Sequence, residues 1–532
     1  MRRNFAIGLL LTVGLALRAV SAQAVDCSPA SIQAIAPTTT TIDTATEITT
    51  GTVPYCAITA HIVTNASLND IIHYDLDLPD AGFWNARLLF SGNGEFGGTI
   101  GDVSKNIPMG YAEAATDTGH TSTAPTESAW ALNNIPAIQD FEYRSVHESA
   151  SASEQILSNY YGNVPYFSYF QGCSTAGRQG LVEAENYPND FDGIVAGDPS
   201  IGQPYLGFNW TQQAILAGST AFFDTKAIDT LNSAVLSQCD GVDGVVDGLI
   251  QDPTKCAFNP ASIQCASGQT KGCLGAGQVA ALNKIYQGPV DTKGNLLYPG
   301  LTVSDPESSA PLDAGWETYI IGCNTQTCMV PNFTAAEPYS SFKKPPVEWS
   351  SQDGFFKDFI FNSASYDTRT ISYKQQHELT KISNTTAQQG GEGQNPNIAK
   401  FASLGHKLLM YHGWSDPAFS PLVSVNYFNS VEGVLGAGSA TTNTLRLFMV
   451  PDMHHCQSSG PGPNDFDALG AMETWVEQGT VPDGIIASHH KMDDFTMPVD
   501  RTMPLCAYPE QAVYNGVGGL NAATSWSCPS SS

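Results

Sequence analysis

Four short apolar runs stand out along the chain, and each ends in a loop rich in glycine or polar residues. They cover residues 86–91, 166–171, 407–411 and 445–450. Apolar runs of this length between turn residues are typical of buried strands. The intervening stretches include helical patterns, such as LVEAENY at 181–187. Strands that alternate with helices predict an α/β fold with a mostly parallel sheet.

Residues 201–395 follow a different pattern. Strand-like runs are scarce there, whereas Pro, Gly and Cys are frequent. Because this segment separates the second apolar run from the third, we expect it to be an insertion that forms a lid. The predicted organisation is a catalytic domain in two parts, 25–200 and 396–532, with the lid domain between them.

The first residues predict the destination of the protein. Arg2 and Arg3 precede an apolar run over 5–17, and Ala22-Gln23-Ala24 has the pattern of a cleavage site. This order is typical of a secretory signal peptide, and the run is too short to span a bilayer. We therefore expect residues 1–24 to be removed and the protein to be secreted; a buried core helix is the alternative.

The segment after the expected cleavage site is rich in Thr and Ala. Residues 28–55 predict a loose N-terminal arm, which Cys27 and Cys56 could hold in place. Sequons of the N-x-[ST] type are typical of glycosylated secreted proteins. They predict glycans at Asn65, Asn209, Asn332 and Asn384.

Composition narrows the possible partners. The chain has 532 residues and is 42% hydrophobic, so a sizeable core is available. It carries 23 basic and 51 acidic residues, a net charge of −28. Such a chain is repelled by nucleic acids and anionic membranes, and we expect neither as a partner. Its 12 cysteines suit a large secreted protein with disulfides.

The candidate nucleophile follows the second apolar run. Gly172-x-Ser174-x-Ala176 has small residues on both sides of a serine. A nucleophile elbow requires small flanks because its strand-to-helix turn is sharp. Ser174 would then lie at the end of the strand, and the N–H of Thr175 would point toward an oxyanion. An ordinary Gly-rich turn is the alternative.

Candidate partners follow the last two apolar runs. Asp416 comes after 407–411, and His454 and His455 come after 445–450. The order Ser, Asp, His is that of α/β-hydrolases, and loops after strand ends are where such folds place their chemistry. The alternatives are a helix N-cap for the aspartate, and a solvated loop or a metal site for the histidines.

Two cysteines connect these candidates. Cys173 directly precedes Ser174, and Cys456 directly follows His455. If the cysteines form a disulfide, their Cα atoms lie about 5.5 Å apart. The serine and the histidine are then held within reach of each other, which favours His455 over His454 as the base.

The combination of Cys173-Ser174, Asp416 and His455-Cys456 resembles the arrangement of the tannase and feruloyl esterase family. Further similar stretches are FEYRSVHE (141–148), GCSTAGRQG (172–180), FDGIVAGDP (191–199), LLMYHGWSD (408–416) and WVEQGTVPD (475–483). The resemblance covers nearly the whole chain after the signal peptide. It implies an α/β-hydrolase fold with a large calcium-binding lid inserted between nucleophile and acid.

The resemblance also implies a serine esterase mechanism. Ser174 attacks an ester carbonyl, His455 moves the proton, and Asp416 orients the imidazole. The oxyanion would be held by backbone N–H groups. One belongs to Thr175 by its position in the elbow, and the resemblance places the other in the Gly-rich turn after the first apolar run, where we choose Glu95.

An acidic segment, CDGVDGVVDGL at 239–249, lies within the expected lid. Hard cations prefer oxygen ligands, and clustered carboxylates repel one another when no cation is bound. The segment resembles the lid calcium site of the family, and a solvated acidic turn is the alternative. The implied ligands of a structural Ca²⁺ are the side chains of Asp240, Asp243 and Asp247 and the carbonyls of Val245 and Leu249.

The remaining cysteines pair by proximity along the chain. The expected pairs are Cys239–Cys256, Cys265–Cys273, Cys323–Cys328 and Cys506–Cys528. The resemblance supports the first, second and fourth pairs and also Cys27–Cys56. The Cys323–Cys328 pair follows only by elimination.

The family divides between hydroxycinnamate esters of plant cell-wall polysaccharide and gallate esters of tannins. The stretches at 141–148 and 172–180 resemble feruloyl esterases of type B more closely, so we expect a feruloyl esterase, with tannase as the alternative. Trp316, Tyr319 and Phe333 are lid candidates for the acyl pocket. A catalytically inactive, calcium-dependent glycan-binding protein or a peptidase are alternatives of another class.

Overall fold

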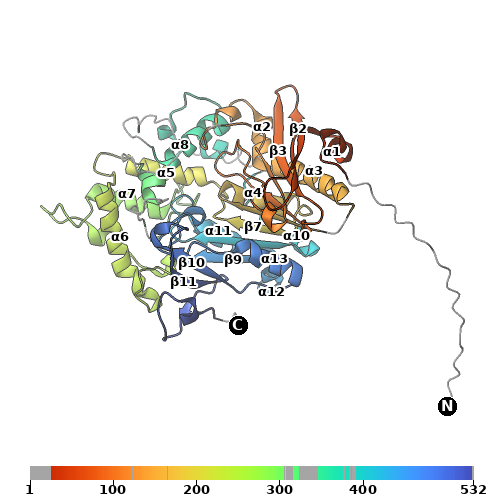
Figure 1. The fold of residues 1–532 in the computed structure, drawn as a ribbon. Helices are drawn as coiled ribbons and strands as arrows, with labels where there is room; N and C mark the ends of the chain where they lie inside the picture. Colours follow the sequence, from red (N-terminus) through yellow and green to blue (C-terminus); the bar gives the residue numbers. More distant parts are fainter. Residues whose placement is uncertain are drawn as a thin grey trace, which may run out of the picture.

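The computed structural model describes residues 25–122, 124–163, 166–304, 306, 315–322, 339, 345–375, 378–382, 385 and 391–529. A nine-stranded sheet crosses the molecule in the order β1-β2-β3-β5-β4-β6-β7-β8-β9 (Figure 1). Its strands are β1 (Thr40–Ile48), β2 (Tyr55–Asn65), β3 (Asp70–Pro79), β4 (Arg87–Ser91), β5 (Ala112–Thr116), β6 (Phe167–Cys173), β7 (Gly193–Gly197), β8 (Lys407–Gly413) and β9 (Leu445–Val450). The four apolar runs are therefore β4, β6, β8 and β9.

The sheet is mixed, and most of its strand pairs are parallel, as predicted. The strands from β5 to β9 pair in parallel, whereas β1, β2, β3 and β5 pair antiparallel. The parallel part carries the candidate nucleophile, acid and base, and the antiparallel strands extend the sheet on one side.

The prediction of a loose N-terminal arm is wrong. Residues 28–55 contain helix α1 (Pro29–Ile35) and strand β1, which extends the sheet by pairing with β2. The threonines of β1 are β-branched and suit a strand. Thr40 and Ile42 are buried, and the residue that follows each of them is exposed, as expected for a strand with one buried face.

Helices cover both faces of the sheet. On β6, Phe170 packs in the core beneath α3, α4 and α11, whereas Tyr169 packs on the opposite face beneath α13. This alternation gives three layers, helix, sheet and helix. The helices outside the expected lid are α1, α2 (Ile135–Gln139), α3 (Ser145–Tyr160), α4 (Thr175–Asn186), α10 (Ala399–Leu404), α11 (Leu422–Leu435), α12 (Ser439–Thr442) and α13 (Ala468–Gln478).

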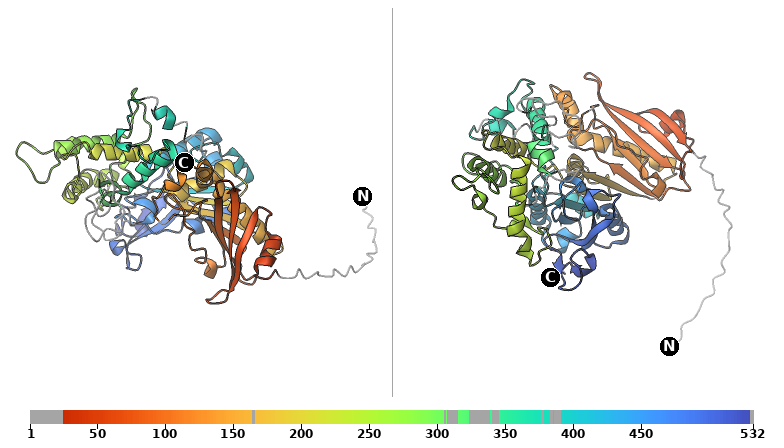
Figure 2. Two further views of the ribbon diagram at one scale, coloured as in Figure 1. Left: turned by 90° about the horizontal axis from the view of Figure 1, so that it is seen from above. Right: turned by 60° about the vertical axis from the view of Figure 1, so that its left-hand side comes forward.

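The segment 201–395 adds no strand to the nine-stranded sheet within the residues described. It contains α5 (Pro204–Ile215), α6 (Thr225–Cys239), α7 (Ala276–Gln287) and α8 (Val347–Gly354). These helices gather on one side of the molecule, away from β1–β3 (Figure 2). A separate apolar cluster around Phe223, Leu231 and Trp316 packs α6 and α7 together. The domain boundaries themselves stay a prediction.

The C-terminal residues form small additions beside β9. Strands β10 (Gly484–His490) and β11 (Val499–Cys506) make an antiparallel pair, and β12 (Val513–Tyr514) pairs with β13 (Trp526–Ser527). Among the described helices, none is long and apolar enough to cross a membrane.

Candidate active site

The turn between β6 and α4 holds Ser174 in a strained conformation, with φ 68° and ψ −125°. A Cβ atom on Gly172 would lie 2.4 Å from that of Ala176, and one on Gly177 would lie 2.3 Å from the carbonyl oxygen of Gly197. The turn therefore has room only for small flanking residues. It has the geometry predicted for a nucleophile elbow, at the carboxyl end of a central strand.

A buried histidine and aspartate lie beside this turn. His455 Nδ1 is 2.7 Å from Asp416 Oδ2, and His455 lines the same cavity as Ser174. Burial opposes a positive charge on His455, but the Asp416 carboxylate outweighs it and raises the pKa of the imidazole. Despite its burial, the charge of His455 holds the pKa of Asp416 well below its usual range. With Nδ1 bonded to an ionised carboxylate, Nε2 is left to exchange a proton with a hydroxyl group.

A disulfide joins the two parts of this site. Cys173 and Cys456 are bonded, with their Cα atoms 5.8 Å apart. The bond therefore holds the end of β6 against the loop that carries His455. The neighbouring His454 bonds elsewhere, with Nδ1 at 2.9 Å from the hydroxyl of Ser459. It is not among the described residues that line the cavity.

Four further predicted pairs are disulfides in the structure: Cys27–Cys56, Cys239–Cys256, Cys265–Cys273 and Cys506–Cys528. The first connects the segment before α1 to β2. The sixth predicted pair, Cys323–Cys328, lies outside the described residues.

The cavity at Ser174 is lined largely by aromatic rings. These rings belong to Phe96, Tyr205, Phe208, Tyr319 and Phe419. Thr175 and Glu95, the candidate oxyanion residues, line it as well. Glu95 has φ 54°, in the left-handed region, which non-glycine residues seldom adopt. Among the described lining residues there is no Lys or Arg, so the Glu95 carboxyl faces no basic side chain other than His455.

The lid contributes to this cavity in part as expected. The ring of Tyr319 lies 5.6 Å from the ring of His455, centroid to centroid. The prediction that Trp316 lines the acyl pocket is wrong. Trp316 is buried in the apolar cluster of the lid and packs against Phe223. Phe333 lies outside the described residues.

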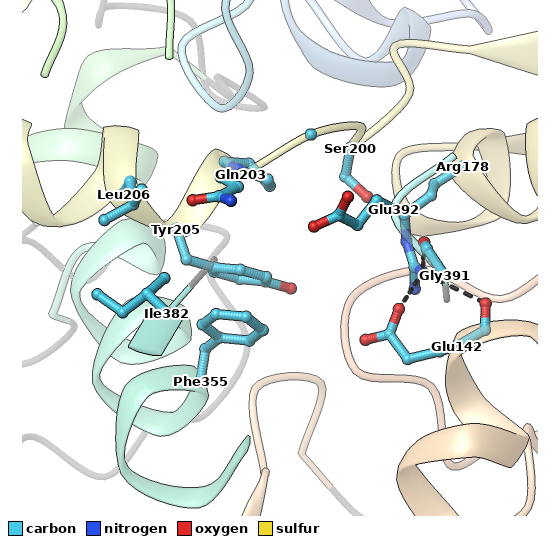
Figure 3. Close-up of a pocket in the computed structure, with 12 residues that line it drawn as sticks. Glu142, Arg178, Ser200, Gln203, Tyr205, Leu206, Phe355, Ile382, Gly391 and Glu392 are labelled. Atoms are coloured by element: carbon cyan, nitrogen blue, oxygen red, sulfur yellow. Dashed lines mark hydrogen bonds and ion pairs between the residues drawn. The ribbon is translucent and has the colours of Figure 1, made fainter. Parts of the chain in front are cut away.

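Tyr205 lines both the active-site cavity and a second cavity beside it. Figure 3 shows its ring stacked on Phe355, at 4.0 Å between centroids, with its hydroxyl directed toward the polar side of that cavity. On that side, the Arg178 guanidinium of α4 bonds to Glu142 and to the carbonyl oxygen of Gly391. Arg178 thus joins the helix behind the nucleophile to the chain that returns from the lid.

Sequence analysis missed two buried residues, Asp198 and His412. Asp198 accepts hydrogen bonds from the N–H groups of Gly413 and Cys456, at 2.8 and 3.1 Å. It therefore holds the acid loop against the base loop, and burial raises its pKa to about 6. His412 Nε2 lies 3.2 Å from Asp416 Oδ2 and supports the same carboxylate as His455. Their place in the sequence could have indicated them, because both residues lie where an apolar strand ends.

The carboxylates around His455 give a testable pH dependence. Glu95 is one of the groups that raise the pKa of His455. The Glu95→Gln variant is expected to lower that pKa, so that a neutral imidazole persists to lower pH. The acid limb of the kcat/KM profile should then move to lower pH. Asp43→Asn, a change at an exposed carboxylate on β1, should leave the limb in place. An unmoved limb in Glu95→Gln would contradict this electrostatic role.

The acidic segment forms a tight turn that follows α6. The Asp240 carboxylate accepts hydrogen bonds from the N–H groups of Asp247 and Gly248, at 3.0 and 3.1 Å. Arg501 Nη1 lies 3.1 Å from Asp247 Oδ2. Burial and the neighbouring Asp240 raise the pKa of Asp243, so the carboxylates are close enough to repel one another. A hard cation would relieve this repulsion. However, Asp240, Asp243 and Asp247 are not among the described groups of three whose ligand atoms all lie within 4.8 Å of one another.

The sequon predictions differ in how they fit the fold. Asn65 ends β2 at a surface turn and is half-buried. Asn209 is fully buried, and its Nδ2 donates to Gln352 Oε1 at 2.9 Å and to the carbonyl oxygen of Thr368 at 3.0 Å. Since a glycan would be attached to that nitrogen, the Asn209 prediction does not fit the folded chain. Asn332 and Asn384 lie outside the described residues.

Comparisons with known proteins place the chain in a family. The family model described as tannase and feruloyl esterase matches residues 56–529. An uncharacterized esterase of Xanthomonas campestris pv. campestris is 29% identical, over 99% of this chain and 94% of the relative. A probable feruloyl esterase of Arthroderma benhamiae is also 29% identical, over 90% of this chain and 86% of the relative.

A solved structure supports the same placement. The crystal structure of feruloyl esterase B from Aspergillus oryzae superposes with a TM-score of 0.78 and 24% identity, covering 93% of this chain and 98% of that one. This likeness shows the α/β-hydrolase fold. The chain therefore belongs to the tannase and feruloyl esterase family and is a carboxylic ester hydrolase.

Proposed function

We propose that the protein hydrolyses feruloyl and related hydroxycinnamoyl esters of plant cell-wall polysaccharide by a Ser174–His455–Asp416 mechanism. The observation that carries the proposal is the disulfide between Cys173 and Cys456. It keeps the neighbours of both cysteines at one cavity, where the Asp416 carboxylate bonds the imidazole.

In the acylation step, Ser174 Oγ attacks the ester carbonyl carbon while His455 Nε2 accepts the hydroxyl proton. The carbonyl oxygen becomes an oxyanion, which the N–H groups of Thr175 and Glu95 stabilise. When the intermediate collapses, the bond to the alkoxy oxygen breaks, and His455 gives its proton to the leaving alcohol. Asp416 stabilises the imidazolium throughout.

Deacylation repeats these steps with water. His455 Nε2 takes a proton from the water molecule, whose oxygen attacks the acyl carbon of the ester on Ser174. The bond from the acyl carbon to Ser174 Oγ then breaks, and the serine oxygen regains a proton from His455. The products are the aromatic acid and the free enzyme.

The lining of the cavity supports an aromatic, phenolic acyl group. Rings from the loops after β4 and β8 and from the expected lid surround the space in which the acyl chain would lie. Aromatic rings pack well against a planar ring. The Glu95 carboxyl can accept a hydrogen bond from a phenol, but it would repel an acyl group that bears its own carboxylate.

Parallel assays on three esters test this proposal. Methyl ferulate is expected to be hydrolysed with the largest kcat/KM, methyl gallate more slowly, and monomethyl terephthalate slowest because of its carboxylate. A preference for gallate would overturn the feruloyl assignment and favour a tannase with the same mechanism. A preference for terephthalate would contradict the role given to Glu95.

We propose that residues 1–24 direct secretion and are then removed, and that Asn65 is an N-glycosylation site. The disulfides support an oxidising, extracellular destination. N-terminal sequencing of protein from the culture medium tests the cleavage. A mature chain that begins at Met1 would contradict it.

We also propose that the acidic turn binds a structural Ca²⁺ through the side chains of Asp240, Asp243 and Asp247 and the carbonyls of Val245 and Leu249. The turn is connected to the active-site loops. Its continuation, Ile250, donates its N–H to Asp452 Oδ2 at 2.6 Å, and Asp452 Oδ1 accepts from the hydroxyl of Ser415 at 2.9 Å. Order in the turn therefore supports the loop that holds Asp416.

Removal of calcium is expected to lower both stability and activity. Chelation should reduce the free energy of unfolding by about 2.7 kcal/mol relative to protein with free Ca²⁺ at 100 times the Kd. Asp243→Asn should show the same loss without chelator, whereas Asp229→Asn, an exposed change on α6, should behave like the wild type. Thermal unfolding with and without Ca²⁺ measures the effect, and identical curves for all samples would contradict the site.

A further inference from the structure

A second cluster of possible metal ligands lies away from the active site, between α3, α4 and the loop before β7. It consists of His147 on α3, Glu183 on α4 and Asp190 in the loop. One ring nitrogen of His147 and one oxygen from each carboxylate all lie within 4.8 Å of one another. The three side chains come from three different segments, so they meet only in the folded protein.

One oxygen of the Glu183 carboxylate, Oε2, is buried without a hydrogen-bond partner in the structure. The residue itself is 1% exposed. A buried carboxylate oxygen with nothing to accept from costs free energy, so a missing cation or proton is implied at this place. Burial and the charge of Asp190 raise the pKa of Glu183 well above its ordinary value.

The other two groups are held in position and remain accessible. His147 stacks on Tyr187 at 3.8 Å between ring centroids, and its Nδ1 lies 2.6 Å from Asp190 Oδ2. The Asp190 carbonyl oxygen accepts a bond from the Ser168 hydroxyl, which fixes the loop on β6. The His147 side chain is 32% exposed, so an ion can enter from solvent.

The surroundings are negative. Glu154 on α3 faces the same loop, and its charge raises the pKa of Glu183 further. In the described part of the chain, no Lys or Arg forms an ion pair with Glu154, Glu183 or Asp190. Burial raises the pKa of Glu154 to about 8, and a cation bound among these carboxyl groups would stabilise their ionised forms, whereas an anion would not.

We propose that His147, Glu183 and Asp190 form a binding site for a divalent transition metal ion, for which Zn²⁺ fits best. One imidazole nitrogen and two carboxylate oxygens suit Zn²⁺, which is commonly held by three protein ligands and a water molecule. The ion would join α3, α4 and the loop before β7. Because α4 carries Ser174 at its other end, the site braces the helix behind the nucleophile and takes no part in the chemistry.

Metal binding to the full chain, with Ca²⁺ in excess to fill the acidic turn, tests the site. Equilibrium dialysis should find one more Zn²⁺ per chain in the wild type than in Glu183→Gln or His147→Gln. Zn²⁺ should raise the Tm of the wild type by about 1–3 °C and leave that of the two variants unchanged. Co²⁺ in place of Zn²⁺ should give a visible absorption band that both variants lack.

His406→Gln is the matched control. His406 bonds to the Pro188 carbonyl oxygen of the same loop but does not belong to the cluster, so this variant should keep the Zn²⁺. Equal Zn²⁺ binding by the wild type and Glu183→Gln would overturn the proposal. The proposal would also be overturned if the wild type bound no extra ion and Glu183→Gln raised the Tm without metal. In that case a proton shared between Glu183 and Asp190 would explain the cluster.

Discussion

The Ser174→Ala variant is expected to lower kcat for an aromatic methyl ester by about 10⁴- to 10⁶-fold. Without the hydroxyl there is no acyl acceptor, whereas the cavity that binds the ester keeps its shape. The small alanine side chain fits the crowded turn at Gly172 and Ala176. Tm should therefore stay close to the wild-type value. Initial rates on methyl ferulate, together with thermal unfolding, measure both effects.

Adjacent histidines provide the control for this prediction. His455→Ala should reduce kcat to a similar extent, because it removes the imidazole bonded to Asp416. His454→Gln should keep most of the activity, since His454 bonds Ser459 instead. If Ser174→Ala stayed active, or if His454→Gln were the inactive variant, the assignment of nucleophile and base would be wrong.

Removing the disulfide beside the active site is expected to cost both stability and activity. The Cys173→Ser/Cys456→Ser double variant opens a loop with a sequence separation of 283. In the chain-entropy model this lowers the free energy of unfolding by about 5–6 kcal/mol. A displacement of the His455 loop by about 1 Å would lower kcat about 100-fold. Denaturant unfolding and initial rates on methyl ferulate measure the two losses.

A loop in the expected lid, residues 265–273, provides a second pair of bonded cysteines for comparison. Cys265→Ser/Cys273→Ser removes a disulfide with a sequence separation of 8, far from Ser174 along the chain. It should lower stability less and leave kcat unchanged. If the two double variants lost activity equally, the prediction would be wrong. The enzyme would then depend on its disulfides in general and not on Cys173–Cys456 in particular.

The fold was predictable where a buried strand has a long run of large apolar residues, whereas the equally buried β5 and β7, which are rich in Ala and Gly, were missed. Strands β4, β6, β8 and β9 have continuous apolar sequences because helices cover both of their faces. Strand β1 was missed because it lies at the sheet edge, where alternate Thr and Glu side chains face solvent. Its composition resembles that of a loop, and only its pairing with β2 makes it a strand.

The candidate site was predictable to the extent that its residues follow strand ends and adjoin cysteines. Ser174 and His455 follow strand ends and adjoin cysteines, and Asp416 follows a strand end. Asp198 and His412 could not be assigned, because their importance depends on the partners that folding brings to them. The burial of Asn209 is likewise a property of packing, since its sequon is indistinguishable from the one at Asn65.

The sequence distance between the two halves of the active site sets the order in which a working enzyme can be assembled. Cys173 leaves the ribosome long before Cys456, and all of the expected lid is synthesised between them. The nucleophile therefore emerges without its base, and the bond that fixes their spacing can form only when the last sheet strand has been added. A nascent or truncated chain would expose the serine but hydrolyse no ester. Catalytic competence thus reports that synthesis has passed Cys456 and that the two cysteines have been oxidised.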